Sequence, residues 1–339
     1  EMTDIFKGNV FKISVLHTVL FLSTLQATAQ INNSIVVKND TVVAELKQQV
    51  YTFQNGESFT YTKPKFFDCV TKIPKDFTGT LRDVSRKNNL IALGVSTLAT
   101  VVLIQSDQKL LDQSRVLGER LGLKSEALYD DFGPLSNIPP NITSGIYLIG
   151  NGTTPILLSM GFATYGLIKK DFRSLNTASG LIESLAVSGI FSQTIKRVTG
   201  RQSPSPAIAD GNPGGAWNPF PSFSAFGKHT PNYDAMPSGH MMTATSALYV
   251  IMGNYPEVKW IRPVGFTLIA AMGFQMVQSN VHWYSDYPIA MVMGYIIGKN
   301  IANSKISKSN IIVAQKKYSF NYSASRAYGM NIIGVKMTF

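Results

Sequence analysis

Six long stretches with little or no charge constrain the fold of this 339-residue chain more than any other feature. Their length favours helices over strands. They cover 90–105, 143–168, 175–195 (interrupted by Glu183), 241–255, 264–281 and 287–298. A further segment, 107–128, alternates apolar residues such as Leu110 and Leu117 with charged ones, which is typical of an amphipathic helix. The sequence therefore predicts a mainly α fold, a helical bundle long enough to bury a sizeable core.

Six apolar helices also raise the alternative that the chain spans a membrane. A spanning helix needs about 20 predominantly apolar residues, and several of these stretches are shorter or rich in Gly, Ser, Thr and Asn. The tail after Gly298 has only basic charges, at Lys299, Lys305, Lys308, Lys316, Lys317, Arg326 and Lys336. If all six stretches spanned, this tail would lie outside, against the positive-inside tendency. These observations favour a compact exported bundle and leave membrane integration open.

Residues 1–29 have the pattern of an export signal. Lys7 and Lys12 precede an apolar run over 13–25, and small residues at Ala27 and Ala29 fit a signal-peptidase site. We expect cleavage after Ala29, with an uncleaved N-terminal anchor as the alternative. The expected location is the periplasm or cell envelope, with membrane association left open.

The remaining chain divides into three predicted parts. An extension over 30–89 is polar, with β-leaning pieces at 34–37 and 51–53, and it leads into a helical domain over 90–302. A β appendage follows over 303–339. In this appendage apolar and polar residues alternate in two runs, which predicts a hairpin, and we expect it to pack against the bundle. The apolar positions are Tyr318, Phe320, Tyr322, Ile333, Val335, Met337 and Phe339.

Charge and cysteine content exclude some classes of function. A formal net charge of +11 suits anionic partners such as phosphates or acidic lipids. The single cysteine, Cys69, excludes an internal disulfide framework and makes a Cys-rich metal site implausible. No basic run with interleaved aromatics suggests nucleic-acid binding.

Three short stretches at the ends of apolar helices contain the candidate chemistry. The first runs from Lys196 to Pro204, the second is Pro-Ser-Gly-His at 237–240, and the third is His-Trp-Tyr-Ser-Asp at 282–286. Each has an ordinary structural explanation: basic residues complement a helix C-terminus, Pro-Ser-Gly caps a helix start, and His with Asp four residues on is often a surface pair. Their joint appearance in this order is far less expected by chance.

The three stretches together resemble the type 2 phosphatidic acid phosphatase and vanadium haloperoxidase superfamily. Members share a helical bundle and a signature: Lys, six residues, Arg-Pro; then Pro-Ser-Gly-His; then Ser-Arg, five residues, His, three residues, Asp. The resemblance covers about residues 90–302. It implies a bundle of the acid phosphatase and haloperoxidase type, to which the polar N-terminal extension and the small C-terminal β-hairpin predicted above are added.

The resemblance also implies a role for each matched residue. His282 would attack the phosphorus and form a phosphohistidine, and Asp286, on the same helix face, would orient its imidazole. His240 would protonate the leaving oxygen. Ser238 and the backbone N–H groups of Gly239 and His240 would hold phosphate oxygens at a helix N-terminus, while Lys196 would add positive charge. No cofactor is implied, and no carboxylate or cysteine spacing indicates a metal.

Two arginines of the signature are missing. Ser203 stands where the first stretch should have arginine, and Met276 stands where the third should, with Gln275 in place of serine. Each loss removes an expected phosphate donor, which typically costs about 3 kcal/mol of transition-state stabilisation. We expect Arg201 to compensate, because Gly200 and Pro204 free its backbone from helical geometry. Arg197, Lys228 and His229 are further candidates.

The long loop over 202–236 carries Trp217, Phe220, Phe223 and Phe226. It is either an aromatic cover over the phosphate pocket, selecting an apolar or lipid-like substituent, or a segment pinned to the bundle by these rings.

The leading functional hypothesis is a phosphatase acting on phosphomonoesters or on lipid or isoprenyl phosphates. The alternative is a protein of the same fold that binds phosphate or phospholipid without turnover, because fold does not fix function. A vanadate-dependent haloperoxidase fits poorly, since vanadate needs the basic ligands that are missing.

Overall fold

The structure is a computed structural model, and it describes residues 48–53, 57–123, 141–310, 319–327 and 330–338. The export signal predicted over 1–29 and the β-leaning piece at 34–37 lie outside the described residues.

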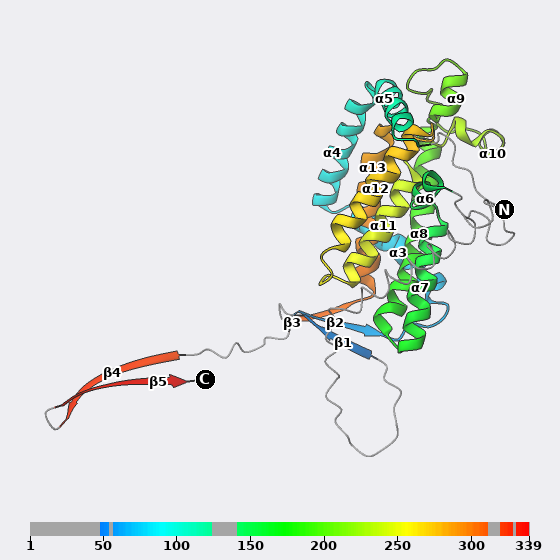
Figure 1. Cartoon of the computed structure of the whole chain (residues 1–339). Coiled ribbons are helices and arrows are strands. Elements are labelled where there is room, and N and C mark those ends of the chain that lie inside the picture. The colour runs from blue at the N-terminus through cyan, green and yellow to red at the C-terminus, as the bar shows by residue number, and fades with distance from the viewer. Residues whose placement is uncertain (1–47, 54–56, 124–140, 311–318, 328–329, 339) are drawn as a thin grey trace, which may run out of the picture.

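The described chain is mainly helical, as the sequence predicts, and its long helices form a bundle (Figure 1). The long helices are α3 (Ile73–Val84), α4 (Lys87–Ile104), α5 (Asp107–Arg120), α7 (Thr153–Lys169), α8 (Phe172–Thr199), α11 (Gly239–Asn254), α12 (Ile261–Gln278) and α13 (Tyr287–Ser304). The short ones are α2 (Asp68–Thr71), α6 (Ile142–Leu148), α9 (Pro204–Ala209), α10 (Phe223–Lys228), η2 (Thr230–Asn232) and η3 (Tyr284–Asp286). The short helix α2 and the long helix α3 both fall inside the range 30–89 that we assigned to the N-terminal extension.

One segment that the sequence predicts as a single helix forms two helices in the structure. The stretch 143–168 forms α6 and α7, which meet at a bend of 76°. Gly150 lies at this break, and a Cβ atom there would come 2.8 Å from the Cβ atom of His240. At the start of α7 the side chain of Asn151 accepts a hydrogen bond from the Thr153 N–H (3.0 Å). The bend therefore lets the α6–α7 connection pack directly against the beginning of α11.

The centre of the bundle is formed by α8, α11 and α13. Small residues let α11 and α13 approach closely, since a Cβ atom on Gly294 would lie 2.6 Å from the carbonyl oxygen of Met242. Across the other interface, buried Ser188 of α8 donates to the hydroxyl of Ser246 on α11 (3.0 Å). These contacts fix the three helix ends that carry the candidate residues.

A small antiparallel sheet covers the end of the bundle where α8 begins (Figure 1). It contains β1 (Gln48–Thr52), β2 (Glu57–Thr62) and β3 (Ser307–Asn310), and Phe59 of β2 pairs with Lys308 of β3. At the start of α8, the guanidinium carbon of Arg173 lies 3.8 Å from the ring centroid of Tyr255. Its Nη2 atom lies 2.7 Å from a carboxylate oxygen of Glu257. At 28 residues, α8 is about 42 Å long, so the sheet and the C-terminal end of α8 lie at opposite ends of the bundle.

The predicted C-terminal hairpin is present as β4 (Ser319–Ala327) and β5 (Met330–Thr338), paired antiparallel. Figure 1 draws it apart from the helices, and its packing against the bundle stays a prediction. Strand β3 closes onto the bundle, and its partner β2 comes from the N-terminal side of the chain.

Two outer regions expose many apolar side chains. Helix α4 is long and apolar enough to cross a membrane, and α6 with α7 would pass the same test as one bent span. The exposed side chains are Leu90, Ile91, Val95, Leu98, Val101 and Val102 on α4, and Ile156, Leu157, Met160, Leu167 and Ile168 on α7.

Candidate active site

The Pro-Ser-Gly-His stretch forms the N-terminus of α11. Ser238 is the N-cap residue, and its buried side chain accepts a hydrogen bond from the Met241 N–H (3.3 Å). Its own N–H donates to the carbonyl oxygen of Asp286 (3.1 Å). The first-turn amides of a helix have no partner within the helix and favour an anion. The second stretch is therefore tied to the third at a point suited to phosphate.

His282 and Asp286 are in contact, but not on one helix face as we expected. The Nδ1 atom of His282 lies 3.3 Å from Oδ2 of Asp286, and both residues are buried. Regular helix begins only at Tyr287, followed by Pro288 in its first turn, and Asn280 adopts a left-handed conformation (φ 57°). The two side chains therefore meet across a loop and the η3 turn. With Nδ1 donating to the carboxylate, Nε2 has the free lone pair.

Asp286 is fixed as an anion by several donors. Its Oδ2 atom accepts from the Trp283 N–H (2.8 Å) and its Oδ1 atom accepts from Nη1 of Arg201 (2.8 Å). Burial opposes ionisation, but Arg201 and His282 together lower the pKa of Asp286 below its usual value. Asp286 can therefore orient His282 over a wide pH range.

Arg201 is completely buried and lies behind this pair. Its Nη2 atom donates to Oδ2 of Asp107 (2.7 Å) and to the carbonyl oxygen of Gly214 (3.0 Å), while Nη1 donates to Asp286 and Ser285. Only Nε lacks a partner among the described residues. The structure thus places Arg201 against the orienting carboxylate. Its predicted role as a phosphate ligand stays a prediction that only Nε could fulfil.

Lys196 lies at the C-terminal end of α8, beside the start of α11. Its Nζ atom would be 3.8 Å from a Cβ atom on Gly239. The same Nζ atom lies 3.4 Å from Oδ2 of Asp234, whose Oδ1 atom accepts from the hydroxyl of Ser203 (3.4 Å). A partly exposed carboxylate therefore stands between Lys196 and the position of the first missing arginine.

His240 is placed beside the nucleophile candidate. Its ring centroid lies 5.9 Å from that of His282 and 5.1 Å from that of Tyr147 on α6. Burial, together with the neighbouring His282 and Lys196, lowers the pKa of His240 to about 3. With this pKa His240 is neutral near pH 7, and an anion beside it would favour the protonated form that a general acid needs.

The other expected sources of positive charge do not converge here. Arg197 lies over the rings of Phe223 and Phe226, 4.1 and 4.4 Å from their centroids, while Lys228 and His229 are exposed. Met276 is fully buried in the apolar core.

The long loop is attached to the end of α8. Phe226 is buried, and the Phe220 N–H donates to the carbonyl oxygen of Arg197 (2.8 Å). Phe220 and Phe223 are 73% and 81% exposed, and the ring centroid of Trp217 lies 5.0 Å from the Arg201 guanidinium carbon. The loop is thus attached by a buried ring and by several backbone hydrogen bonds, among them Asn218 N–H to the Gly200 carbonyl (2.9 Å) and Ser205 N–H to the Asn280 carbonyl (3.0 Å), while two phenyl rings stay exposed.

Residues 177–305 match the family model described as the PAP2 superfamily. This segment belongs to that superfamily. PAP2 proteins generally hydrolyse phosphate esters. No curated protein and no solved structure matched the chain.

The PAP2 segment contains all three candidate stretches, but two residues of the site lie outside it. Asp107, at the start of α5, binds Arg201 and also accepts from the Ser285 N–H (3.1 Å). Tyr147 covers His240. Sequence reasoning missed both, because Asp107 reads as an ordinary first-turn acid of an amphipathic helix and Tyr147 as one apolar residue among many.

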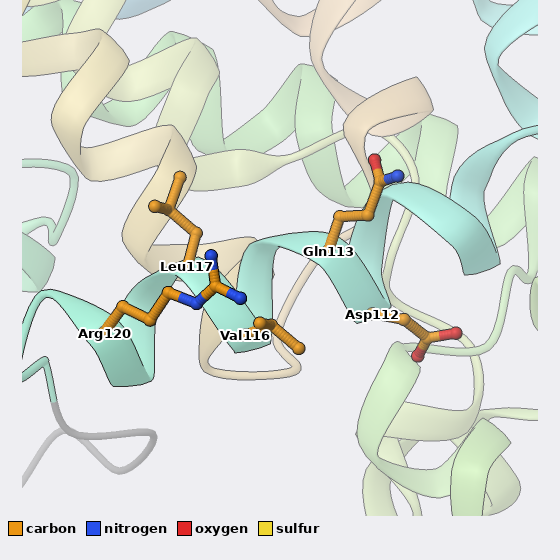
Figure 2. A pocket seen from close by; sticks show the side chains of 5 residues that line it. All are labelled: Asp112, Gln113, Val116, Leu117 and Arg120. Carbon is orange, nitrogen blue, oxygen red and sulfur yellow. The ribbon is translucent and has the colours of Figure 1, made fainter.

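Two further features bear on ligands. A surface hollow on α5 is lined by Asp112, Gln113, Val116, Leu117 and Arg120, all on one helix (Figure 2). None of these residues belongs to the PAP2 site. Among the described residues, no group of three or more His, Cys, Asp or Glu side chains could hold a metal ion.

Proposed function

We propose that this chain is a phosphoric ester hydrolase that acts through a phosphohistidine on His282. The observation that carries the proposal is the contact between His282 Nδ1 and the Asp286 carboxylate (3.3 Å), with the His240 ring centroid 5.9 Å from that of His282. The nucleophile, its orienting carboxylate and the leaving-group acid are then all side chains, so the proposed reaction needs no metal ion.

The reaction has two balanced steps. Nε2 of His282 forms a bond to phosphorus as the bond to the leaving oxygen breaks, and His240 gives its proton to that oxygen. A water molecule then attacks the phosphohistidine, and His240 takes back a proton as the bond between phosphorus and nitrogen breaks. Lys196, the Ser238 hydroxyl and the first amides of α11 would hold the phosphoryl oxygens.

Phosphate release in EDTA from a panel of aryl phosphate, phosphatidate and isoprenyl diphosphate tests this function. We expect turnover of at least one compound, loss of that turnover in His282→Ala, and an acid-labile phosphoenzyme on His282. Well-folded protein that turns over none of the three would contradict the proposal.

The alternative, binding without turnover, is favoured by the positions of Ser203 and Met276 and by the engagement of Arg201 with two carboxylates. Vanadate binding without hydrolysis of any panel compound would support it, and a trapped phosphohistidine would eliminate it.

We propose a lipid or isoprenyl phosphate as the substrate class. The exposed phenyl rings of Phe220 and Phe223 flank the end of α8 that carries Lys196, and α4 and α7 expose apolar side chains to their surroundings. These exposed apolar side chains could cover the apolar tail of such a substrate. Faster turnover of phosphatidate in mixed micelles than of a soluble monoester is expected, and the reverse order would favour a soluble substrate.

We further propose export to the periplasm or cell envelope, on the basis of the signal pattern over 1–29. Intact-mass analysis of protein from the fractionated cell envelope should give a chain that begins at Gln30. Full-length chain in the cytoplasmic fraction alone would contradict export.

A further inference from the structure

Ser192 is a buried side chain of α8, one helical turn before Lys196, that the proposed reaction does not use. It is only 4% exposed, and its hydroxyl oxygen has no hydrogen-bond partner among the described residues. Helical Ser and Thr side chains commonly bond a carbonyl of the preceding turn, as Thr194 does with Ile190 (2.7 Å). Ser192 departs from this habit, and a buried hydroxyl without a hydrogen bond is destabilising.

The hydroxyl of Ser192 lies against the first residue of α11. A Cβ atom on Gly239 would be 3.2 Å from Ser192 Oγ and 3.8 Å from Lys196 Nζ. The space beside Gly239 is therefore bordered by an unpaired hydroxyl, an ammonium group and the first amides of a 16-residue helix. All three can donate hydrogen bonds, and within the described part of the chain the atoms nearest to a Cβ position on Gly239 belong to Ser192 and Lys196, not to an acidic side chain.

We propose that Ser192 donates a hydrogen bond to a non-bridging oxygen of the phosphoryl group bound at this point. The inference rests on the anion site of the proposed function but not on turnover. Ser192, a neutral donor, would thereby make one of the contacts to phosphoryl oxygens that arginines make in the family signature. The unpaired hydroxyl of Ser192 is then a preorganised ligand for the anion, and it gains a hydrogen-bond partner when phosphate binds.

Orthovanadate and inorganic phosphate binding by the full chain tests the inference, measured by calorimetry for wild type, Ser192→Ala and Ser184→Ala. Ser184 is the matched control, because it is buried on the same helix two turns away and its hydroxyl donates to the carbonyl of Leu181 in that helix (2.9 Å). We expect Ser192→Ala to weaken both anions about tenfold to a hundredfold, the usual value of a hydrogen bond to a charged group. Ser184→Ala should bind them as wild type does.

The thermal midpoints of the free proteins separate ligand binding from a structural role. Ser192→Ala should unfold at or above the wild-type temperature, because it removes an unsatisfied hydroxyl, and vanadate should raise its midpoint less than that of wild type. Wild-type vanadate affinity in Ser192→Ala would overturn the inference, as would a weaker affinity accompanied by a lower midpoint. Weaker binding in a protein without turnover would uphold it while refuting the phosphatase function.

Discussion

Nη1 of Arg201 and Oδ1 of Asp286 lie 2.8 Å apart, and neither side chain is accessible to solvent. Arg201 therefore comes from the stretch expected to bind phosphate, yet its terminal nitrogens hold the residue that orients His282. A second buried carboxylate, Asp107, binds the other side of the guanidinium (2.7 Å). Arg201 thus contacts His282 only indirectly, by binding the Asp286 carboxylate that orients the imidazole.

Replacing Arg201 should destabilise the protein as well as reduce its activity. Arg201→Met leaves two buried carboxylates without their cation, so we expect about 3–5 kcal/mol lower free energy of unfolding in urea titrations. Arg201→Lys keeps the charge but loses the fork of donors, and it should lie between wild type and Arg201→Met. A variant with unchanged stability and weakened vanadate binding would instead show that Arg201 binds the phosphoryl group.

Anion binding should become tighter as the pH falls, because of His240. Its pKa is lowered to about 3, and a bound dianion opposes that shift, so binding takes up a proton. Sulfate is a suitable ligand because it stays a dianion between about pH 5 and pH 8. We expect its affinity to rise over that range as the pH is lowered, and the rise to be reduced in His240→Gln. Equal slopes in the two proteins would assign the proton to another group.

The same depressed pKa has a consequence for stability. The unfolded chain binds a proton at His240 at a higher pH than the folded chain does. The resulting stabilisation is complete above the ordinary histidine pKa and is lost as the pH falls toward 3. Acid unfolding of His240→Gln should therefore be less steep than that of wild type.

Restoring the two missing arginines should have opposite outcomes. Ser203 lies beside the partly exposed carboxylate of Asp234, so Ser203→Arg should fold and bind vanadate about tenfold more tightly. Met276 is fully enclosed in the core, and Met276→Arg would bury a charge without a partner. We expect that variant to be poorly expressed or unfolded. Folded Met276→Arg with tighter vanadate binding would show that the family position still faces the site.

Asp234 should weaken phosphate binding by competing for Lys196. Asp234→Asn removes the carboxylate 3.4 Å from the ammonium group, and we expect about threefold to tenfold tighter phosphate binding in calorimetry. Asp210→Asn is the control, since Asp210 is an exposed acid of the same loop that accepts from Gln202 (2.7 Å). Identical effects of both changes would indicate a general charge effect.

The glycine that ends α8 fixes the loop to the helix. Gly200 has a φ of 55°, and a Cβ atom there would overlap the carbonyl oxygen of Asn218. Gly200→Ala should lower the free energy of unfolding by about 2–4 kcal/mol, from the left-handed conformation and the clash together. Gly189→Ala, on the same helix with open space around its Cβ position, should be neutral or slightly stabilising. Similar losses in both variants would contradict this explanation.

The sequence was sufficient to predict most helices and the neighbourhood of His240, His282 and Asp286, because apolar runs and short motifs are local signals. It was insufficient for the His282–Asp286 geometry, since spacing alone cannot distinguish one helical turn from a loop followed by a 3₁₀ turn. The partner of β2 was also missed, because β3 has only four residues, Ser-Lys-Ser-Asn, and no apolar alternation.

The contacts of Arg201 show why the rest of the site could not be predicted from the sequence. Its distance along the chain from Asp107 and Asp286 gives no hint that the three side chains meet, because their contact depends on how α5 and η3 pack. The same holds for Ser192, whose hydroxyl is distinguished from other helical serines only by the partner that it lacks.

The pairing of β2 with β3 joins an early and a late segment at the end of the bundle where α8 begins. A carrier protein or solid support tethered next to either strand would therefore attach at that end. His240 and His282 lie near the other end of α8, so the support would be on the order of 40 Å from them.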